Sequence, residues 1–269
     1  MPYAIHVGLA GWAIRKEQRD LFGEAGSHLQ RYAARFATVE INSSFYRPHQ
    51  HDTYVRWSDS VPGGFRFSVK MPRWLTHDRC LADTGDDLRQ FLREVSGLGP
   101  KLGCILVQLP PGLPYDRRTV ETFCSALRSR HRGPIAWEPR HPTWFTGAAD
   151  RRLEAHGMAR VAADPICGEG GGDPGGSERV TYFRLQGSPV MYHLELRRCV
   201  PRRAGEATVG GECACARVVH LRQHGAGRSR HRRRASYVPT RRASARRRSC
   251  RRRWCRRRAL TRSDPREWS

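Results

Sequence analysis

The chain has 269 residues, with 49 Lys and Arg against 25 Asp and Glu, which gives a formal net charge of +24. Residues 1–193 hold 25 basic and 20 acidic groups (+5), whereas residues 194–269 hold 24 and 5 (+19), so only the first part is composed like a globular protein. No apolar run approaches the ~20 residues of a membrane span, and no secretory signal opens the chain. The nine cysteines therefore favour free thiols. We expect a cytoplasmic protein without membrane contact, and we exclude a disulfide-stapled secreted scaffold.

Seven apolar, β-rich runs recur through residues 1–193, and stretches with helical spacing separate them. In chain order, the expected strands are residues 4–8, 38–41, 65–70, 104–109, 135–138, 159–163 and 180–185. The expected helices are residues 26–36, 50–60, 86–98, 119–130 and 148–156. Residues 168–176 are rich in glycine but lack the Gly-Lys-Ser/Thr ending of a phosphate loop, so we expect a surface loop there. This α/β alternation suits a (β/α) barrel or a doubly wound sheet.

Polar side chains stand where the expected strands end, and in a parallel barrel these ends converge on the site. In chain order they are Glu40, Asn42, Lys70, Gln108, Glu138, Arg140, Asp164 and Arg184. Lys70, Arg140 and Arg184 could present three cations to one anion, since Arg grips a phosphate or carboxylate through two hydrogen bonds. Alternatively, these cations pair with the carboxylates of the same set. Both interpretations can hold together.

Several side chains near the strand ends are candidates for catalysis or ligand contact. Glu40 and Glu138 could form an acid and base pair of the glycosidase type, if their neighbours separate the two pKa values. His77 and His141 are suited to proton transfer near neutral pH, although His141 could instead hold its own loop. Tyr46 could stack on a ligand or simply pack. Glu40, Glu138, Asp164 and a His could form a metal site, but no close ligand pair such as His-x-x-x-His occurs among the strands, so we expect no metal. We also expect no cofactor.

Six ordered strings follow the strand ends: GLAGW (8–12), VEINSSFY (39–46), FRFSVKMPRWLTH (65–77), KLGCILVQLPP (101–111), WEPRHPTWF (137–145) and YFRLQGSP (182–189). Over residues 3–193 this set resembles the YecE-like family, also called domain of unknown function 72. The resemblance implies a TIM-type barrel, in a family whose biochemical activity is not established. The chain departs from the family in its opening motif, which usually reads Gly-Thr/Cys-Ser-Gly-Trp, and at Gln186, where the family usually has His.

The resemblance stops after His193, although the family continues through one more strand. The tail from residue 194 has 24 Arg but no Lys, Ile, Phe, Met or Asn. When synonymous codons are chosen for residues 193–205 and 216–225 and then read one base over, both segments give sequences that resemble the end of the family. We therefore interpret residues 1–193 as one barrel domain and residues 194–269 as a frameshifted, disordered tail. The barrel is then an incomplete TIM-type barrel, with seven recognisable strands and the eighth lost in the tail.

These patterns favour a barrel that binds or acts on an anionic small molecule bearing a phosphate or carboxylate, as a hydrolase or an isomerase. The three cations would hold the anion, one of the two glutamates would move a proton, and Asn42 and Gln108 would orient hydroxyl groups. The rival interpretation is a nucleic-acid-binding protein that acts through the barrel mouth or the Arg-rich tail. A steep salt dependence with DNA or RNA would distinguish it.

Overall fold

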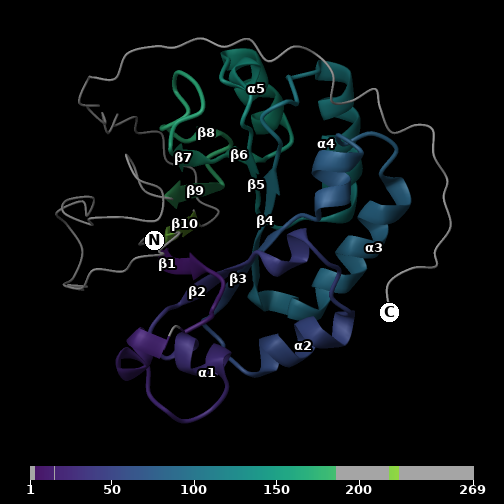
Figure 1. Cartoon of the computed structure of the whole chain (residues 1–269). Helices are drawn as coiled ribbons and strands as arrows, with labels where there is room; N and C mark the ends of the chain where they lie inside the picture. Colours follow the sequence, from purple (N-terminus) through teal and green to yellow (C-terminus); the bar gives the residue numbers. More distant parts are fainter. Residues whose placement is uncertain (1–3, 15, 186–217, 224–269) are drawn as a thin grey trace, which may run out of the picture. The chain divides into compact units, whose positions relative to one another are not determined.

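Strands and helices alternate along the chain, and the strands curl into a barrel with helices outside it (Figure 1). This computed structural model describes residues 4–14, 16–185 and 218–223. All seven expected strands are present: β1 Ala4–Ala10, β2 Thr38–Ile41, β3 Arg66–Lys70, β4 Leu102–Gln108, β5 Ile135–Glu138, the pair β6 Ala159–Arg160 and β7 Ala162–Asp164, and β9 Val180–Leu185. Val161 splits the sixth strand because its first half pairs with β5 and its second half with β9.

Five α-helices connect these strands, as the sequence predicts: α1 His28–Ala33, α2 His51–Asp59, α3 Gly85–Val95, α4 Arg117–Arg130 and α5 Gly147–Ala155. Side chains fix where three of them begin, since Ser27, Asp116 and Thr146 accept hydrogen bonds from first-turn N–H groups. Short helices that the sequence did not indicate fill the loops: η1 Lys16–Leu21, η2 Ser43–Phe45, η3 Trp74–Asp78, η4 Ser96–Lys101 and η5 Pro142–Trp144. None of the helices in the described ranges is long and apolar enough to cross a membrane.

Strands β1 to β6 pair in parallel and in chain order, as a (β/α) barrel requires. β7 is parallel to β9. Because β6 and β7 are consecutive and joined by Val161, the two ends of the strand order meet and the sheet closes into a barrel. The two-residue strand β8, Gly175–Gly176, lies in the expected glycine-rich loop and pairs with β6. The prediction of a TIM-type barrel with seven recognisable strands is therefore confirmed.

The position of the eighth strand, between β9 and β1, is held by β10, Val218–Gln223. An eighth strand lost in the tail would leave β1 and β9 with open edges, and this consequence of the sequence analysis is wrong, because β10 pairs with both. An open edge offers N–H and C=O groups to any extended segment, and residues 218–221 read Val-Val-His-Leu. β10 is antiparallel to both neighbours, unlike the parallel eighth strand of a complete barrel. The rest of residues 194–269 lies outside the described part, so its disorder and the frameshift stay predictions.

Two apolar clusters lie on opposite sides of the strands, because successive residues of a strand face opposite ways. The larger cluster contains outward residues such as Val39, Val69 and Trp137 together with helix residues such as Leu88 and Phe91. The smaller cluster lines the inside of the barrel and consists of Cys104, Leu106, Ala136, Ala159, Val161, Ala163, Val180 and Tyr182. Its members come from β4 to β9 and fill only part of the interior, which leaves room for polar side chains at the carboxyl ends.

Candidate functional site

The inside of the barrel changes from apolar to polar toward the carboxyl ends of the strands. Six polar side chains there are at most 5% exposed: Glu40 on β2, Ser68 and Lys70 on β3, Glu138 on β5, and Tyr182 and Arg184 on β9. Residues two apart on a strand share a face, which explains why β3 and β9 each contribute a pair. Buried charges at this density are tolerated only where they pair, so the pairing decides what the site can do.

Arg184 binds both glutamates at once. Its Nε and Nη2 donate to Oε2 and Oε1 of Glu40, each at 3.0 Å. Its Nη1 donates to Oε2 and Oε1 of Glu138 at 3.0 Å and 3.3 Å. The sequence left open whether the three cations bind an anion or pair with the carboxylates, and Arg184 pairs with the carboxylates. One guanidinium from β9 thus fixes the carboxylates of β2 and β5 relative to each other.

The surroundings of Glu40 decide its charge. Burial acts to raise the pKa of Glu40, but the charge of Arg184, its hydrogen bonds, the charge of Lys70 and the hydrogen bond from Tyr182 outweigh burial, so the pKa lies below its ordinary value. Glu40 is therefore ionised near neutral pH. An ionised carboxylate accepts a proton but has none to donate, so Glu40 does not suit the general-acid role in the expected glycosidase-type pair.

Two residues that the sequence analysis missed complete this network. Tyr182 Oη donates to Oε2 of Glu40 at 3.0 Å and lies 2.9 Å from Oγ of Ser68. Burial, and then the charge of Glu40, hold the pKa of Tyr182 well above its ordinary value, so the phenol keeps its proton. The period of two along β9 was the available signal, since Tyr182 must share the face of Arg184.

Lys70 and His77 lie against the same aromatic ring. Lys70 Nζ is 3.8 Å from the centroid of the Phe45 ring, and the His77 ring is 4.9 Å from it, centroid to centroid. Burial, followed by the charges of Lys70 and Arg73, lowers the pKa of His77 to about 4. His77 is therefore neutral at pH 7 and a weaker base than an ordinary histidine.

Arg140 reaches the cluster from the loop after β5. Its Nη2 pairs with Oε1 of Glu138, and its Nη1 donates to Sγ of Cys167 at 3.4 Å. Asp164 ends β7, and burial raises the pKa of its carboxyl. In the described residues Asp164 joins no ion pair, so its expected pairing with the cations is not seen there.

Asn42 and Gln108 each place a carboxamide oxygen in a buried position. Within the described part of the chain, neither Oδ1 of Asn42 nor Oε1 of Gln108 has a hydrogen-bond partner. Gln108 ends β4 opposite Glu138 of β5, and Asn42 follows β2. A buried acceptor without a donor costs about 1–3 kcal/mol. These oxygens therefore suit the expected role of accepting hydrogen bonds from a ligand.

The other two candidate residues lie apart from this network. Tyr46 is 70% exposed, and its ring meets Phe45 edge to face. His141 Nδ1 accepts a hydrogen bond from the Thr143 N–H at 3.3 Å and lies 2.9 Å from Thr143 Oγ1. These contacts agree with the alternative that His141 holds its own loop. The described residues include no group of three or more His, Cys, Asp or Glu that could hold a metal ion.

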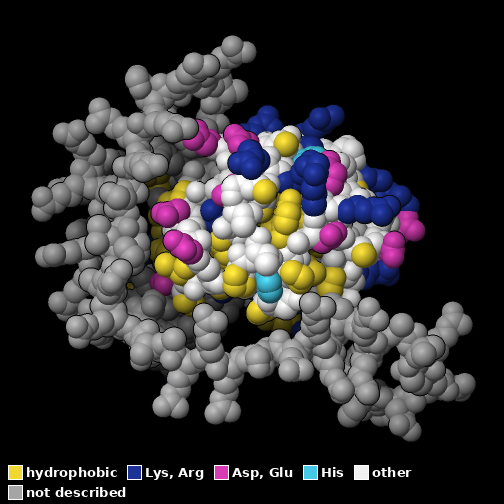
Figure 2. Space-filling view, turned by 90° about the horizontal axis from the view of Figure 1, so that it is seen from above, with side chains coloured by type: hydrophobic (Ala, Val, Ile, Leu, Met, Phe, Trp, Pro, Cys, Tyr) yellow, Lys and Arg dark blue, Asp and Glu magenta, His cyan; other side chains and the backbone are white. Residues whose placement is uncertain are grey.

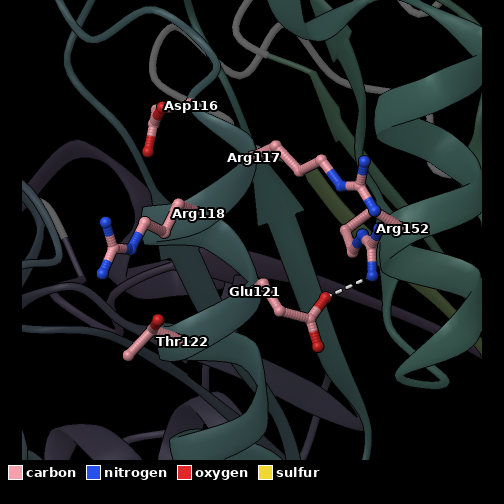
Figure 3. A pocket seen from close by; sticks show the side chains of 6 residues that line it. All are labelled: Asp116, Arg117, Arg118, Glu121, Thr122 and Arg152. Carbon is pink, nitrogen blue, oxygen red and sulfur yellow. Dashed lines mark hydrogen bonds and ion pairs between the residues drawn. The ribbon is translucent and has the colours of Figure 1, made fainter.

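A shallow depression of about 430 Å³ lies on the outer helices, away from all of these residues (Figure 3). It is lined by Asp116, Arg117, Arg118, Glu121, Thr122 and Arg152. Glu121 already pairs with Arg152 and lies 3.1 Å from His156 Nε2. Because Glu121 is paired, Asp116 caps α4 and the rim is solvent-exposed, we place the candidate site inside the barrel and not here.

Known proteins resemble this chain in sequence. Residues 6–260 match the family described as "Protein of unknown function DUF72". The UPF0759 protein YecE of Escherichia coli K12 is 28% identical over 166 residues, which cover 60% of this chain and 59% of that protein. The UPF0759 protein YunF of Bacillus subtilis strain 168 is 26% identical over 177 residues, which cover 62% and 63%. A crystal structure of a DUF72 family protein from Thermotoga maritima superposes with a TM-score of 0.49 at 26% identity, covering 59% and 65%.

The chain spans about three-fifths of the length of the curated relatives that it matches. The family match also continues past His193, where we expected the resemblance to end, and it includes β10. The resemblance drawn from the six strings is confirmed. The chain is a member of the DUF72 family.

Proposed function

We propose that this protein binds, and acts on, a small molecule that carries a phosphate or carboxylate, at the carboxyl ends of the barrel strands. The observation that carries the proposal is the convergence of Lys70, Arg140 and Arg184 with two glutamates inside one barrel. Strand ends from β2 to β9 contribute to it, and these are the ends where barrel enzymes place their sites.

The three cations have different roles in this proposal. Arg184 positions Glu40 and Glu138, because its donors already serve their four carboxylate oxygens. Arg140 and Lys70 are the cations that meet the anion, and a guanidinium grips phosphate or carboxylate well. Asn42 and Gln108 accept hydrogen bonds from hydroxyl groups of the ligand.

Proton transfer is the chemistry that this arrangement favours. Glu138, held by Arg184 and Arg140, is the residue we assign to accepting a proton from the ligand. His77, whose pKa is lowered to about 4, stays neutral at pH 7 and is too weak a base to be the main proton acceptor. Because the pKa of Glu40 is lowered and Glu40 has no proton to donate, isomerisation by proton abstraction or hydrolysis through an activated water fits best.

Thermal unfolding with inorganic phosphate, sulfate and sugar phosphates tests the proposal. A ligand that binds only the folded state stabilises it by about 2.7 kcal/mol at 100 times its Kd, so the Tm rises. We expect Arg140→Gln to abolish the rise for at least one anion. Arg152→Gln is the matched control, because it removes an arginine paired with a glutamate outside the barrel.

Phosphate and sulfate also stabilise proteins without binding to a site. An equal rise in wild type, Arg140→Gln and Arg152→Gln would therefore contradict the proposal. Nucleic acid is the rival ligand, through the +24 charge of the chain. On the face shown in Figure 2, basic side chains lie among acidic and apolar ones and form no continuous stripe. DNA or RNA binding that falls steeply with salt, without any small-anion effect, would favour the rival.

A further inference from the structure

Tyr182 carries a hydroxyl group on an apolar body inside the barrel. The side chain is 0% exposed and lies on the inward face of β9, two residues before Arg184. Its ring belongs to the apolar cluster inside the barrel, together with Cys104 and Leu106, while its Oη lies 3.0 Å from Oε2 of Glu40. Close packing holds a buried ring in one orientation, so the hydroxyl group meets Glu40 from a fixed position.

The hydrogen bonds of Tyr182 run in one direction. A phenol has a single proton, and the Tyr182 phenol keeps it, because burial and then the charge of Glu40 raise its pKa. Since Glu40 is ionised, this proton is donated to the carboxylate. Ser68 Oγ lies 2.9 Å from Tyr182 Oη and must therefore donate to the phenol oxygen. The chain of bonds runs from Ser68 on β3 through Tyr182 to Glu40 on β2, and each bond polarises the next.

Tyr182 and Arg184 together hold the Glu40 carboxylate at three points. Oε2 of Glu40 accepts from Tyr182 Oη and from Arg184 Nε, and Oε1 accepts from Arg184 Nη2, each at 3.0 Å. The two parallel bonds from Arg184 keep the guanidinium and the carboxylate aligned with each other. The terminal torsion of a glutamate is broad, however, so the aligned pair can turn as a unit. The bond from Tyr182 comes from a separate side chain and fixes that turn.

The orientation of Arg184 decides where the Glu138 carboxylate lies. While Nε and Nη2 of Arg184 contact Glu40, Nη1 donates to Oε2 and Oε1 of Glu138 at 3.0 Å and 3.3 Å. A turn of the guanidinium about its contact with Glu40 would carry Nη1 away from Glu138. Arg140 pairs with Oε1 of Glu138, so the carboxylate would then follow Arg140. A hydrogen bond at β2 is in this way coupled through one arginine to the carboxylate of β5.

We propose that Tyr182 is a positioning residue, which sets the orientation of Glu40 and, through Arg184, the place of the Glu138 carboxylate. The inference rests on the proposed function, which assigns Glu138 to proton transfer. A misplacement of about 1 Å can lower a reaction rate about 100-fold, so a residue that acts through others affects the chemistry of a site. Ser68 supports Tyr182 in this role, as the donor to the phenol oxygen.

Carbon-13 NMR of the full chain, labelled at the carboxyl carbon of the glutamate side chains, tests this inference at pH 7. Glu40→Gln and Glu138→Gln assign the two signals. Tyr182→Phe removes the hydroxyl group and keeps the ring. Tyr32→Phe is the matched control, because Tyr32 is 1% exposed and its Oη also makes two hydrogen bonds, both with main-chain groups.

We expect the Glu40 and Glu138 signals both to shift in Tyr182→Phe and both to keep their wild-type positions in Tyr32→Phe. Ser68→Ala should shift them in the same direction by less, and it decides the inference if Tyr182→Phe does not fold. A Glu138 signal that stays in place while the Glu40 signal shifts, or that shifts equally in Tyr32→Phe, would overturn the positioning role.

Thermal unfolding with anions separates this inference from the proposed function. Stabilisation by an anion that depends on Arg140, with the Glu138 signal unmoved in Tyr182→Phe, would leave the proposed function standing and reject the positioning role. A shifted Glu138 signal in a protein that no anion stabilises would do the reverse.

Discussion

A guanidinium that is 1% exposed needs an acceptor for nearly every donor, and Arg184 finds them on two glutamates. Taking all three charges out of water is expensive, so the network contributes less to stability than its contacts suggest. Its larger effect is geometric, because it sets the spacing of Glu40 and Glu138. Removal of the arginine alone would leave two buried carboxylates facing each other.

Arg184→Met should therefore lower the free energy of unfolding by about 3–5 kcal/mol, the usual cost of breaking a buried ion pair from one side. Urea denaturation measures the loss. Arg152→Met is the comparison, because the partner Glu121 is 41% exposed, and such pairs contribute up to about 1 kcal/mol. Similar losses in the two variants would show that the Arg184 network is not buried as described.

His77 should make stability depend on pH between about 4 and 6.5. Its pKa is lowered to about 4 in the folded protein, by burial and then by Lys70 and Arg73, against an opposing effect of Asp78. In that interval the unfolded chain binds a proton at His77 that the folded protein does not, so stability falls as the pH falls from 6.5 to 4.

Denaturation of wild type and His77→Gln across this interval checks the sign. The variant should lose stability less steeply on acidification. Three other histidines, His6, His49 and His131, also have lowered pKa values and contribute to the slope of both proteins, so the difference isolates His77. Identical slopes would mean that His77 titrates normally in the folded protein.

At the residue scale, the sequence predicted which side chains reach the strand ends and left their partners open. Glu40, Glu138 and Arg184 were identified because each ends an apolar run. Their mutual contacts depend on distances across the barrel, between residues as far apart as Glu40 and Arg184, which local patterns do not carry. His141 and Tyr46 were chosen from nearby motifs, and the structure places them outside the network.

Among the elements, the glycine-rich loop is held by one buried side chain as well as by the short strand β8. Arg160, 5% exposed, donates through Nε and Nη2 to both carboxylate oxygens of Asp150 on α5, at 2.7 Å and 3.1 Å. Its Nη1 donates to Gly170 O and Asp173 O, each at 3.1 Å. The segment before these carbonyls carries Cys167, which contacts Arg140 at the site. The composition predicted the loop, but no pattern in the sequence indicated Arg160 as its anchor.

Arg160→Gln should free this loop and lower the free energy of unfolding by about 1–3 kcal/mol, since buried acceptors lose their donors. Limited proteolysis with thermolysin should then cut within residues 165–177 faster than in wild type. An unchanged cleavage rate there would show that the loop is held by other contacts.

At the scale of elements, the positions of strands and helices could be predicted from the pattern of apolar residues. Each strand is either a short apolar run or an alternation of apolar and polar residues. The expected ranges 38–41, 135–138 and 180–185 coincide with β2, β5 and β9. The split at Val161 was not predictable, because it reflects which neighbours the sixth strand pairs with and not its own composition.

At the scale of the whole barrel, the place of the eighth strand is taken by β10. This strand runs antiparallel to β9 and β1, whereas the eighth strand of a complete barrel is parallel to its neighbours. We propose that the written tail results from a shifted reading frame after residue 193. In the unshifted frame, a parallel eighth strand would lie between β9 and β1, where β10 lies here. Antiparallel pairing satisfies the same backbone groups, and the side chains of Ile5 and Val7 on β1 are 47% and 43% exposed.

A chain translated one base over after codon 193 should be more stable and unfold more cooperatively than the written chain, because a complete β/α unit would cover this apolar face. Thermal unfolding and limited proteolysis of both chains measure the difference. The frameshift would be contradicted if the chain with the present sequence resisted protease beyond Arg217 and unfolded as cooperatively as the chain translated one base over.

The anion site inside the barrel is tested most directly by a crystal structure of the protein grown with inorganic phosphate. The account predicts phosphate density within hydrogen-bond distance of the Arg140 guanidinium and Lys70 Nζ. Phosphate bound only in the outer depression, at Arg117 and Arg118, with the barrel interior unchanged, would contradict it.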